Sequence, residues 1–455
     1  MSQRDQDFEL SPWADLIARA PQILVGFSGG LDSTLLLKLL SQQIDPSRIT
    51  AVHINHGLSV HADNWQALVE DYSKQLGVNF YTQKVHVKSS GQGFEAAARE
   101  KRYAVFESLI KPDGLLFLAH HADDQAETVL YRLLRGSGPK GLSAMANCRP
   151  IGAGSLIRPL LAWNKSQILA CANRLNIAWA EDESNQDNGF DRNYLRNKVF
   201  PEISKRWPDY TQSLQQSADL CYQSEQLAEE MAADDLVYLG QREERDGYSI
   251  AIEIFKSLST LRQRNVLRHW ALQKQAPLPT GKIIDEVLKS VVNARDDAAP
   301  VVIWQSMQWT RFQGRLYLLK PQKAQKAQKA QEGKFNQKQQ AEWSMQAPLV
   351  LADNSVLHCQ PVTGSGIKAN IGPLVIRYRQ GGERCKPFGR DHSNSLKKLL
   401  QEYAVPPWYR DRVPLLYSDN TLVAVADLWV CDGWNAETDE PGLKINWQVN
   451  HVEDV

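Results

Sequence analysis

Between residues 22 and 135 the hydrophobic positions fall into alternating short and long blocks. Short continuous apolar runs are typical of buried parallel strands, whereas longer stretches with apolar residues three or four apart are typical of helices. This pattern predicts strands at residues 23–27, 49–54, 79–85 and 115–119. It predicts helices that begin after the residue 28–33 loop and at residues 62–76, 94–111 and 123–135.

Repeated strand–helix units indicate an α/β fold with a parallel sheet and right-handed crossovers. In a doubly wound, Rossmann-like sheet with strand order 3-2-1-4-5, the first and fourth strands are neighbours at the switch point. Ligands bind there, beyond the carboxyl ends of the strands. We therefore expect the loops after the first and fourth predicted strands to face one cleft.

The rest of the chain has a different pattern. The pattern predicts a helix at residues 163–175 and a long polar connector helix at residues 208–236. The segment that follows ends in a β-like stretch at residues 301–319. Residues 322–331 repeat Lys-Ala-Gln, which is typical of a linker. The predicted domains are residues 1–207 (α/β), 208–320 (helical connector and middle domain), 321–347 (low-complexity linker) and 348–455 (small α+β domain).

Composition narrows the class of protein. The 455 residues carry a formal net charge of zero, so any nucleic-acid surface has to be local. The chain has no long apolar run that predicts a membrane span, and its first residues lack the apolar stretch of a signal peptide. Six cysteines without a Cys-x-x-Cys pair favour free thiols in a cytoplasmic protein and argue against a zinc ribbon.

A glycine loop follows the first predicted strand, and its sequence is Ser28-Gly29-Gly30-Leu31-Asp32-Ser33. Glycines let a ligand approach the backbone, and a helix N-terminus favours negative charge. The loop is not a Walker motif, because no Gly-Lys-[Ser/Thr] follows. The alternative is a tight strand-to-helix turn in which Asp32 or Ser33 caps the helix.

The same six residues resemble the PP-loop of ATP pyrophosphatases, which cleave ATP to AMP and pyrophosphate. In that interpretation, phosphates are held by the Ser28 and Ser33 hydroxyls and by the backbone of Gly29 and Gly30. Asp32 would help to hold Mg2+, since a carboxylate beside a polyphosphate suits a hard cation.

The second stretch with candidate chemistry opens the helix after the fourth predicted strand. It reads His120-His121-Ala122-Asp123-Asp124-Gln125-Ala126-Glu127. Asp124 and Glu127 are three residues apart, so they share a helix face and could grip an ammonium, hold Mg2+ or act as a base. The alternatives are helix-end charge for the acids and polar filling for the two histidines.

Further clusters, taken singly, are more often caps, turns or surface ion pairs than sites. They are 53–56, Arg99 with Arg102, 134–138, 158–161, 181–185 and 192–196. Together and in this order, they resemble the tRNA(Ile)-lysidine synthetase family, the lysidine-forming branch of the PP-loop enzymes. The resemblance covers residues 20–205 and resumes at residues 377–416.

The resemblance implies a two-step reaction on the wobble cytidine of the isoleucine tRNA with a CAU anticodon. ATP adenylates the C2 oxygen of the cytidine, and free L-lysine then displaces AMP to form lysidine. The resemblance implies ATP and Mg2+ as cofactors, and it assigns Leu31 and His53 to the ATP site with the rest of the loop. Asp124 and Glu127 would bind lysine, and they would act with Asp32 and Arg99 in catalysis. The implied tRNA-binding residues are Arg192, Arg196, Arg377, Arg384, Arg390, Lys397 and Lys398.

Residues 377–412 have a local basic excess, with nine Lys or Arg against four acidic residues. Aromatic residues are interleaved with the basic ones at positions 378, 388, 403, 408 and 409. Basic groups with aromatics suit phosphate contact and stacking on exposed bases. The alternative is a solvated surface above a small core to which the aromatics belong.

Two features depart from the family pattern: Ser59 stands where the family usually has Arg, and the Lys-Ala-Gln repeat is peculiar to this chain. Rival interpretations are a PP-loop sulfur transferase acting on tRNA, an amidating ligase, and a nucleotide-binding RNA chaperone without catalysis. Sulfur transfer usually needs paired cysteines, and a chaperone has no reason to place Asp124 and Glu127 opposite the loop. The sequence leaves the oligomeric state open, with a homodimer as one alternative.

Overall fold

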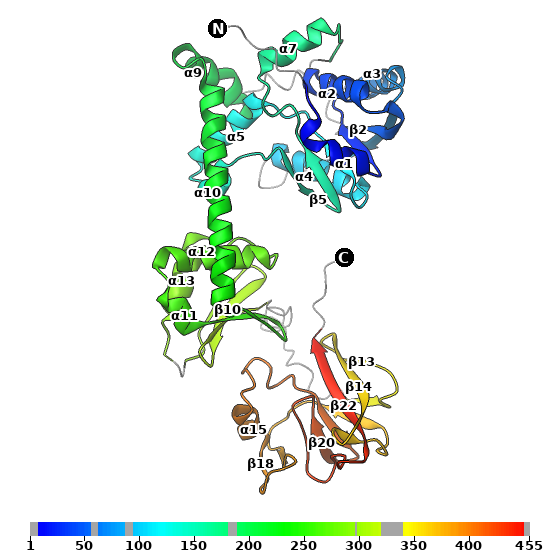
Figure 1. Cartoon of the computed structure of the whole chain (residues 1–455), viewed down its shortest axis with the longest axis vertical. Coiled ribbons are helices and arrows are strands. Elements are labelled where there is room, and N and C mark those ends of the chain that lie inside the picture. Colours follow the sequence, from blue (N-terminus) through cyan, green and yellow to red (C-terminus); the bar gives the residue numbers. More distant parts are fainter. Residues whose placement is uncertain are drawn as a thin grey trace. The chain divides into compact units, whose positions relative to one another are not determined.

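The computed structural model describes residues 8–55, 62–86, 94–180, 189–295, 298–319 and 340–449. The chain divides into two compact units, Met1–Leu227 and Ala228–Val455. Four features of the sequence lie outside the described residues: His56, Ser59, the acidic segment 181–185 and the Lys-Ala-Gln repeat. Figure 1 shows both units and labels some of their helices and strands.

The first unit contains a six-stranded sheet in the order β3-β2-β1-β4-β6-β5. The strands are β1 (Ile23–Gly26), β2 (Ile49–Asn55), β3 (Asn79–Lys84), β4 (Leu115–Phe117), β5 (Cys148–Ile151) and β6 (Gly154–Ile157). All pairs are parallel except β5 with β6. The predicted order 3-2-1-4-5 is confirmed with β6 in the fifth place. The antiparallel edge strand β5 was not predicted, because its four residues lack a continuous apolar run.

The helices of the first unit precede, connect or follow these strands. They are α1 (Ala14–Arg19), α2 (Leu31–Gln43), α3 (Ala62–Gln75), α4 (Phe94–Leu109), α5 (Ala122–Leu134), α6 (Pro139–Leu142), α7 (Lys165–Arg174), α8 (Asp191–Tyr194) and α9 (Phe200–Arg206). A π-helical turn, η4 (Leu195–Val199), joins α8 to α9. Helix α10 (Tyr210–Tyr238) contains the residues at which the two units divide.

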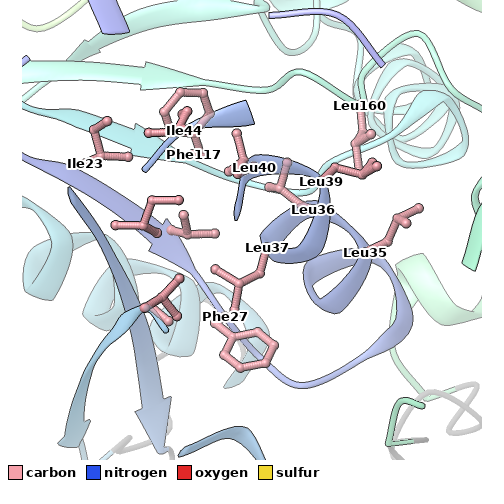
Figure 2. Close-up of a cluster of buried hydrophobic side chains, with 14 of the residues drawn as sticks. Ile23, Phe27, Leu35, Leu36, Leu37, Leu39, Leu40, Ile44, Phe117 and Leu160 are labelled. Atoms are coloured by element: carbon pink, nitrogen blue, oxygen red, sulfur yellow. The ribbon is translucent and has the colours of Figure 1, made fainter. Parts of the chain in front are cut away.

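Both faces of this sheet are covered. Ile23 and Val25 of β1 pack with the leucines of α2 in one core cluster, which Figure 2 shows in close-up. Leu24 belongs to a separate cluster with Phe106 of α4. Because neighbouring strand residues point to opposite faces, α2 and α4 lie on opposite faces of the sheet. This burial on two faces explains why β1 is continuously apolar rather than alternating.

The second unit begins with an antiparallel sheet in the order β7-β8-β11-β10-β9. Its elements are β7 (Arg242–Glu244), β8 (Gly247–Ala251), α11 (Ile252–Ser257), α12 (Thr260–Gln273), α13 (Gly281–Glu286), the π-helical turn η5 (Val287–Val292), β9 (Val301–Trp304), β10 (Met307–Phe312) and β11 (Arg315–Leu319). Trp309 packs between Trp270 and Trp304, with ring centroids 5.0 Å and 5.6 Å away. The β-like end of this segment was predicted, whereas β7 and β8 were not.

The remainder of the second unit contains a five-stranded and a four-stranded antiparallel sheet, with the short pair β17 and β18. The elements are β12 (Ala341–Trp343), β13 (Leu349–Val350), β14 (Ser355–Thr363), β15 (Ile367–Lys368), β16 (Leu374–Arg377), β17 (Arg384–Cys385), β18 (Asn394–Ser395), α15 (Leu396–Glu402), β19 (Leu415–Ser418), β20 (Thr421–Val425), β21 (Trp429–Val430) and β22 (Pro441–Val449). This α+β arrangement agrees with the prediction. None of the helices in the described parts of the chain is long and apolar enough to span a membrane.

We predict that Leu36→Ala destabilises the first unit by about 2–5 kcal/mol, because it removes a fully buried side chain from the core between α2 and the sheet. Urea unfolding followed by circular dichroism measures the loss. Leu133→Ala is the matched control, since Leu133 on α5 is 52% exposed and its truncation should change stability by at most about 0.5 kcal/mol. Equal destabilisation by the two substitutions would contradict the assignment of Leu36 to the core.

Candidate active site

The loop between β1 and α2 turns at Gly29, where the backbone has a φ of +86°. Residues with a side chain rarely adopt this conformation. A Cβ built on Gly29 would also lie 2.6 Å from Cγ1 of Val69, which is too close. Both the backbone conformation and the packing therefore require glycine at this position.

Two serine hydroxyls hold the loop in shape. The Ser28 and Ser33 Oγ atoms are 3.0 Å apart, and the Ser28 N–H donates to Ser33 Oγ at 3.2 Å. Gly30 occupies the cap position of α2, and no side chain caps the helix. The alternative in which Asp32 or Ser33 is the cap is therefore wrong. Uncapped N–H groups at a helix N-terminus are suited to bind an anion.

His53 supports the loop from β2. Its Nδ1 lies 3.0 Å from the Phe27 carbonyl oxygen, and the side chain is buried. Burial lowers the pKa of His53, although the bond to Phe27 opposes this effect. A neutral imidazole with its proton on Nδ1 donates to the carbonyl and fixes the residue that precedes the loop. Contact of His53 with a nucleotide stays a prediction.

His121 contacts both stretches that the sequence marks as candidate chemistry, the 28–33 loop region and residues 120–127. Its Nε2 lies 3.7 Å from Oδ2 of Asp32 on α2 and 3.5 Å from Oδ2 of Asp124 on α5. Its Nδ1 lies 3.5 Å from Oδ2 of Asp123. The structure thus brings the loop after β1 and the loop after β4 together, as predicted. Polar filling, the alternative interpretation of His121, does not account for its position beside three carboxylates.

The charge around His121 explains its protonation behaviour. Burial acts to lower the pKa of this imidazole, but Asp124, Asp123 and Asp32 together raise it above the ordinary value. Burial likewise acts to raise the pKa of Asp123, and the bond from His121 reverses the effect. Three carboxylates therefore favour the protonated form of an imidazole that is only 4% exposed.

Lys165, the first residue of α7, is a site residue that the sequence did not reveal. Its Nζ lies 2.6 Å from Oδ1 of Asp32, and its backbone N–H donates to Oδ2 of Asp123 at 2.8 Å. The residue is more than 130 positions from Asp32 along the chain. No local pattern marks it, because only the fold of the sheet brings α7 to this place.

Asp124 and Glu127 hold the guanidinium of Arg196. Glu127 Oε1 accepts from Arg196 Nε at 2.6 Å, and Glu127 Oε2 accepts from Nη2 at 2.9 Å. Nη2 also lies 3.4 Å from Oδ1 of Asp124. Burial raises the pKa of Glu127 more than Arg196 lowers it, since the carboxylate is only 2% exposed. The two acids thus share one cation, which shows that their spacing suits this task.

Two of the predicted basic residues lie elsewhere in this unit. Arg99 of α4 donates to the Tyr103 hydroxyl at 3.3 Å and stacks over its ring, and no contact joins it to the described acids of the site. Arg192 lies in α8, one turn before Arg196. A role in tRNA binding for Arg192 and Arg196, and a catalytic role for Arg99, stay predictions.

The predicted tRNA-binding residues of the second unit line a part of the fold that includes β16, β17 and α15. Arg377 stacks over Tyr417, Arg384 donates to the Ser393 carbonyl, and Arg390 pairs with Glu402. Lys397 and Lys398 are exposed in the first turn of α15.

The interleaved aromatics divide into two groups. Tyr378 and Tyr409 are buried, so the core alternative is right for these two. Phe388 is 60% exposed and Tyr403 is 37% exposed. Trp408 is half-buried against Phe312 and Tyr317, and the Tyr403 ring contacts Trp429 and Arg390. Phe388 is therefore the most open ring of the five.

A glycine phosphate loop at the switch point of a doubly wound parallel sheet defines the first unit as a PP-loop domain. Residues 6–203 match the family described as "PP-loop domain". Residues 251–317 match a "TilS substrate binding domain", and residues 374–447 match a "TilS substrate C-terminal domain".

Curated relatives identify the branch of this class. The tRNA(Ile)-lysidine synthase of Coxiella burnetii is 36% identical over 430 residues, which cover 93% of this chain and 92% of that one. That of Methylococcus capsulatus is 35% identical over 93% of this chain and 95% of its own. That of Yersinia pseudotuberculosis is 37% identical over 96% of this chain and 98% of its own. The chain belongs to the tRNA(Ile)-lysidine synthase family, and it is an ATP-using enzyme of this kind.

We predict a pH-dependent stability contribution from His121. Its pKa is raised in the folded protein, so the stabilisation is complete below the unfolded value of about 6.5 and is lost as the pH rises through the folded pKa. The loss of unfolding free energy in His121→Asn should therefore be largest near pH 5.5 and smaller at pH 8.5. Urea unfolding of both proteins across this range measures it.

His53→Asn provides a control of opposite sign. Because the folded pKa of His53 is lowered, its contribution is present above the unfolded value and is lost as the pH falls. The deficit of this variant should shrink towards pH 5.5. A deficit of His121→Asn that is constant with pH would contradict the histidinium assignment.

Proposed function

We propose that this chain ligates free L-lysine to C2 of the wobble cytidine in the isoleucine tRNA with a CAU anticodon. The reaction passes through an adenylated cytidine and releases pyrophosphate and then AMP. The observation that carries this proposal is the contact of His121 with both Asp32 and Asp124. This contact supports the proposal, because it brings the phosphate loop close to the helix that carries Asp124 and Glu127, and a lysine ligation driven by ATP requires such proximity.

The loop fits the phosphates of ATP. Gly30 leaves the backbone open, because a Cβ built there would meet only Ser28 Oγ at 3.6 Å, and the uncapped N-terminus of α2 offers N–H groups to an oxyanion. Lys165 lies beside the loop and adds a positive charge at Asp32. Asp32, Asp123 and Asp124 supply carboxylate oxygens, the donor type that suits Mg2+, and Mg2+ bound here would offset phosphate charge.

The acids Asp124 and Glu127 fit the ammonium group of lysine. They already hold the guanidinium of Arg196, so their oxygens are placed to accept hydrogen bonds from a cation. Glu127 is buried, so a cation bound to it gains more than it would in water. Lysine therefore competes with Arg196 for these oxygens or shares them.

The order of bond changes follows from the chemistry of cytidine. The C2 oxygen is a poor leaving group until it bears AMP. The lysine amine attacks C2 only after losing its proton, because an ammonium has no free electron pair. As the new C–N bond forms, the C–O bond breaks and AMP departs. The chain's own contribution is to hold the amine, the cytidine and the phosphates in reach of one another.

The second unit supplies groups suited to RNA. Lys397 and Lys398 are exposed on α15, and Arg384 and Arg390 lie on the preceding segment. The exposed ring of Phe388 sits between these basic groups along the chain. Basic side chains with an exposed aromatic suit phosphate contact and base stacking. We assign tRNA affinity to this segment and chemistry to the first unit.

The experiment that tests this assignment is Glu127→Gln. A charge-assisted hydrogen bond contributes roughly 1.5–3 kcal/mol, so the KM for lysine should rise about 10- to 100-fold. Pyrophosphate release in a single turnover should persist, since Glu127 lies on α5 rather than in the phosphate loop. Adenylated tRNA should then accumulate.

Glu202→Gln is the matched control, because the Glu202 side chain is 70% exposed and pairs only with Lys205 among the described residues. It should leave both steps unchanged. Slow pyrophosphate release in Glu127→Gln that excess Mg2+ restores, and excess lysine does not, would show that Glu127 binds the metal instead.

A further inference from the structure

A second group of charged side chains lies on the face of the first sheet opposite α2. Tyr103 of α4 is its centre, and Arg99 lies one helical turn before it with the guanidinium 5.0 Å from the ring centroid. Arg149 of the edge strand β5 places its guanidinium 5.3 Å from the same ring. The guanidinium of Arg158, directly after β6, is near enough to Tyr103 to lower the pKa of its hydroxyl. Three arginines from three elements therefore converge on one tyrosine.

These arginines have neutral partners. Arg158 is 2% exposed, and its Nε and Nη1 donate to His120 Nδ1 at 3.2 Å and to the Ala146 carbonyl at 2.7 Å. Arg149 donates to the carbonyl of Pro150. Within the described ranges, no carboxylate forms a salt bridge with Arg99, Arg149 or Arg158. Three positive charges are thus gathered without an acid to balance them.

The excess of positive charge helps to lower the pKa values of two neighbouring groups, Tyr103 and His120. Burial acts to raise the pKa of Tyr103, yet Arg99 and Arg158 lower it below the ordinary value. Burial first and then Arg158 and Arg99 hold the pKa of His120 well below its usual range. His120 is therefore neutral and accepts a bond from Arg158. Concentrated like charges cost free energy, which a bound anion would offset.

The geometry favours a phosphate oxyanion. Guanidinium groups offer paired N–H donors that match phosphate oxygens, and the Tyr103 hydroxyl is a further donor. The ATP phosphates are not the expected occupant, because the phosphate loop precedes α2 on the other face of the sheet. The two adjacent histidines contact the two different groups of charges. His121 contacts the carboxylates of the site, and His120 contacts Arg158 of the arginine cluster.

We propose that Arg99, Arg149, Arg158 and Tyr103 bind a backbone phosphodiester of the RNA, next to the nucleotide that enters the active site. The adjacent histidines place this site one residue along the chain from the reacting groups. A phosphodiester fixed there would orient its nucleotide towards Asp32 and Asp124. The proposal rests on the proposed function, because it takes the substrate to be RNA.

The test uses the full-length protein and anticodon stem-loop RNAs, each with one loop phosphate replaced by an uncharged methylphosphonate. For the wild-type protein, replacement at one position should weaken binding about tenfold. Arg149→Gln should bind the unmodified RNA about tenfold more weakly, and it should be insensitive to the same replacement. Arg149→Lys should restore part of the affinity, since it keeps the charge without the planar fork of donors.

Arg19→Gln is the matched control, because Arg19 is an exposed arginine in the last turn of α1 and belongs to none of the candidate clusters. It should bind every RNA as the wild type does. Thermal unfolding of each variant shows whether the fold is retained. A second variant, Tyr103→Phe, keeps the ring and removes the hydroxyl donor, and it should show the same selective loss in smaller degree.

Two results would overturn the proposal. One is a methylphosphonate profile of Arg149→Gln that is the same as that of the wild type. The other is an increase in the KM for ATP with unchanged RNA affinity, which would assign the cluster to the nucleotide. Failure of the proposed function gives a different result: the phosphodiester dependence on Arg149 holds, but no lysine enters the RNA.

Discussion

The site depends on the parallel pairing of β1 with β4. Ile23, Leu24 and Val25 pair with Leu115, Leu116 and Phe117, so the two strands end at the same edge of the sheet. Each strand is followed by a helix whose first turn carries acids, Asp32 on α2 and Asp124 on α5. These carboxylates would repel each other without a cation between them. Lys165 pairs with Asp32 and Arg196 with Asp124, and His121 lies between the two carboxylates at the turn into α5.

Two groups of charged side chains lie near the sheet edge at which β1 and β4 end, one on each side. The carboxylates lie on one side with His121, Lys165 and Arg196 as their counter-charges. The arginines around Tyr103 lie on the other side with carbonyl and imidazole partners. The first arrangement is balanced and suits the exchange of one cation for another. The second has an excess of positive charge and suits an anion. An enzyme that joins an amine to an RNA nucleotide needs both.

Local pattern was enough to predict the sheet and the loop. The apolar runs predicted the first four strands, and the doubly wound pattern of strand–helix units predicted their order. The glycines of the loop predicted a tight turn, and Gly29 has a positive φ there. Asp124 and Glu127 share a helix face as their spacing requires. Contacts between distant segments could not be predicted in this way. Lys165, Arg149 and Arg158 reach their partners only through the fold, and Arg196 meets Glu127 from 69 residues away. The short strands β5, β7 and β8 have too few apolar residues to show a period.

The central claim is that one site couples phosphate release from ATP to the addition of lysine to RNA. The most direct measurement is mass spectrometry of the nucleosides from a CAU-anticodon isoleucine tRNA after incubation with the protein, ATP and isotope-labelled lysine, with the adenosine products analysed in parallel. The account predicts that cytidine gains the labelled lysine, in step with AMP and pyrophosphate. Formation of ADP, or release of AMP and pyrophosphate without lysine in the tRNA, would contradict it.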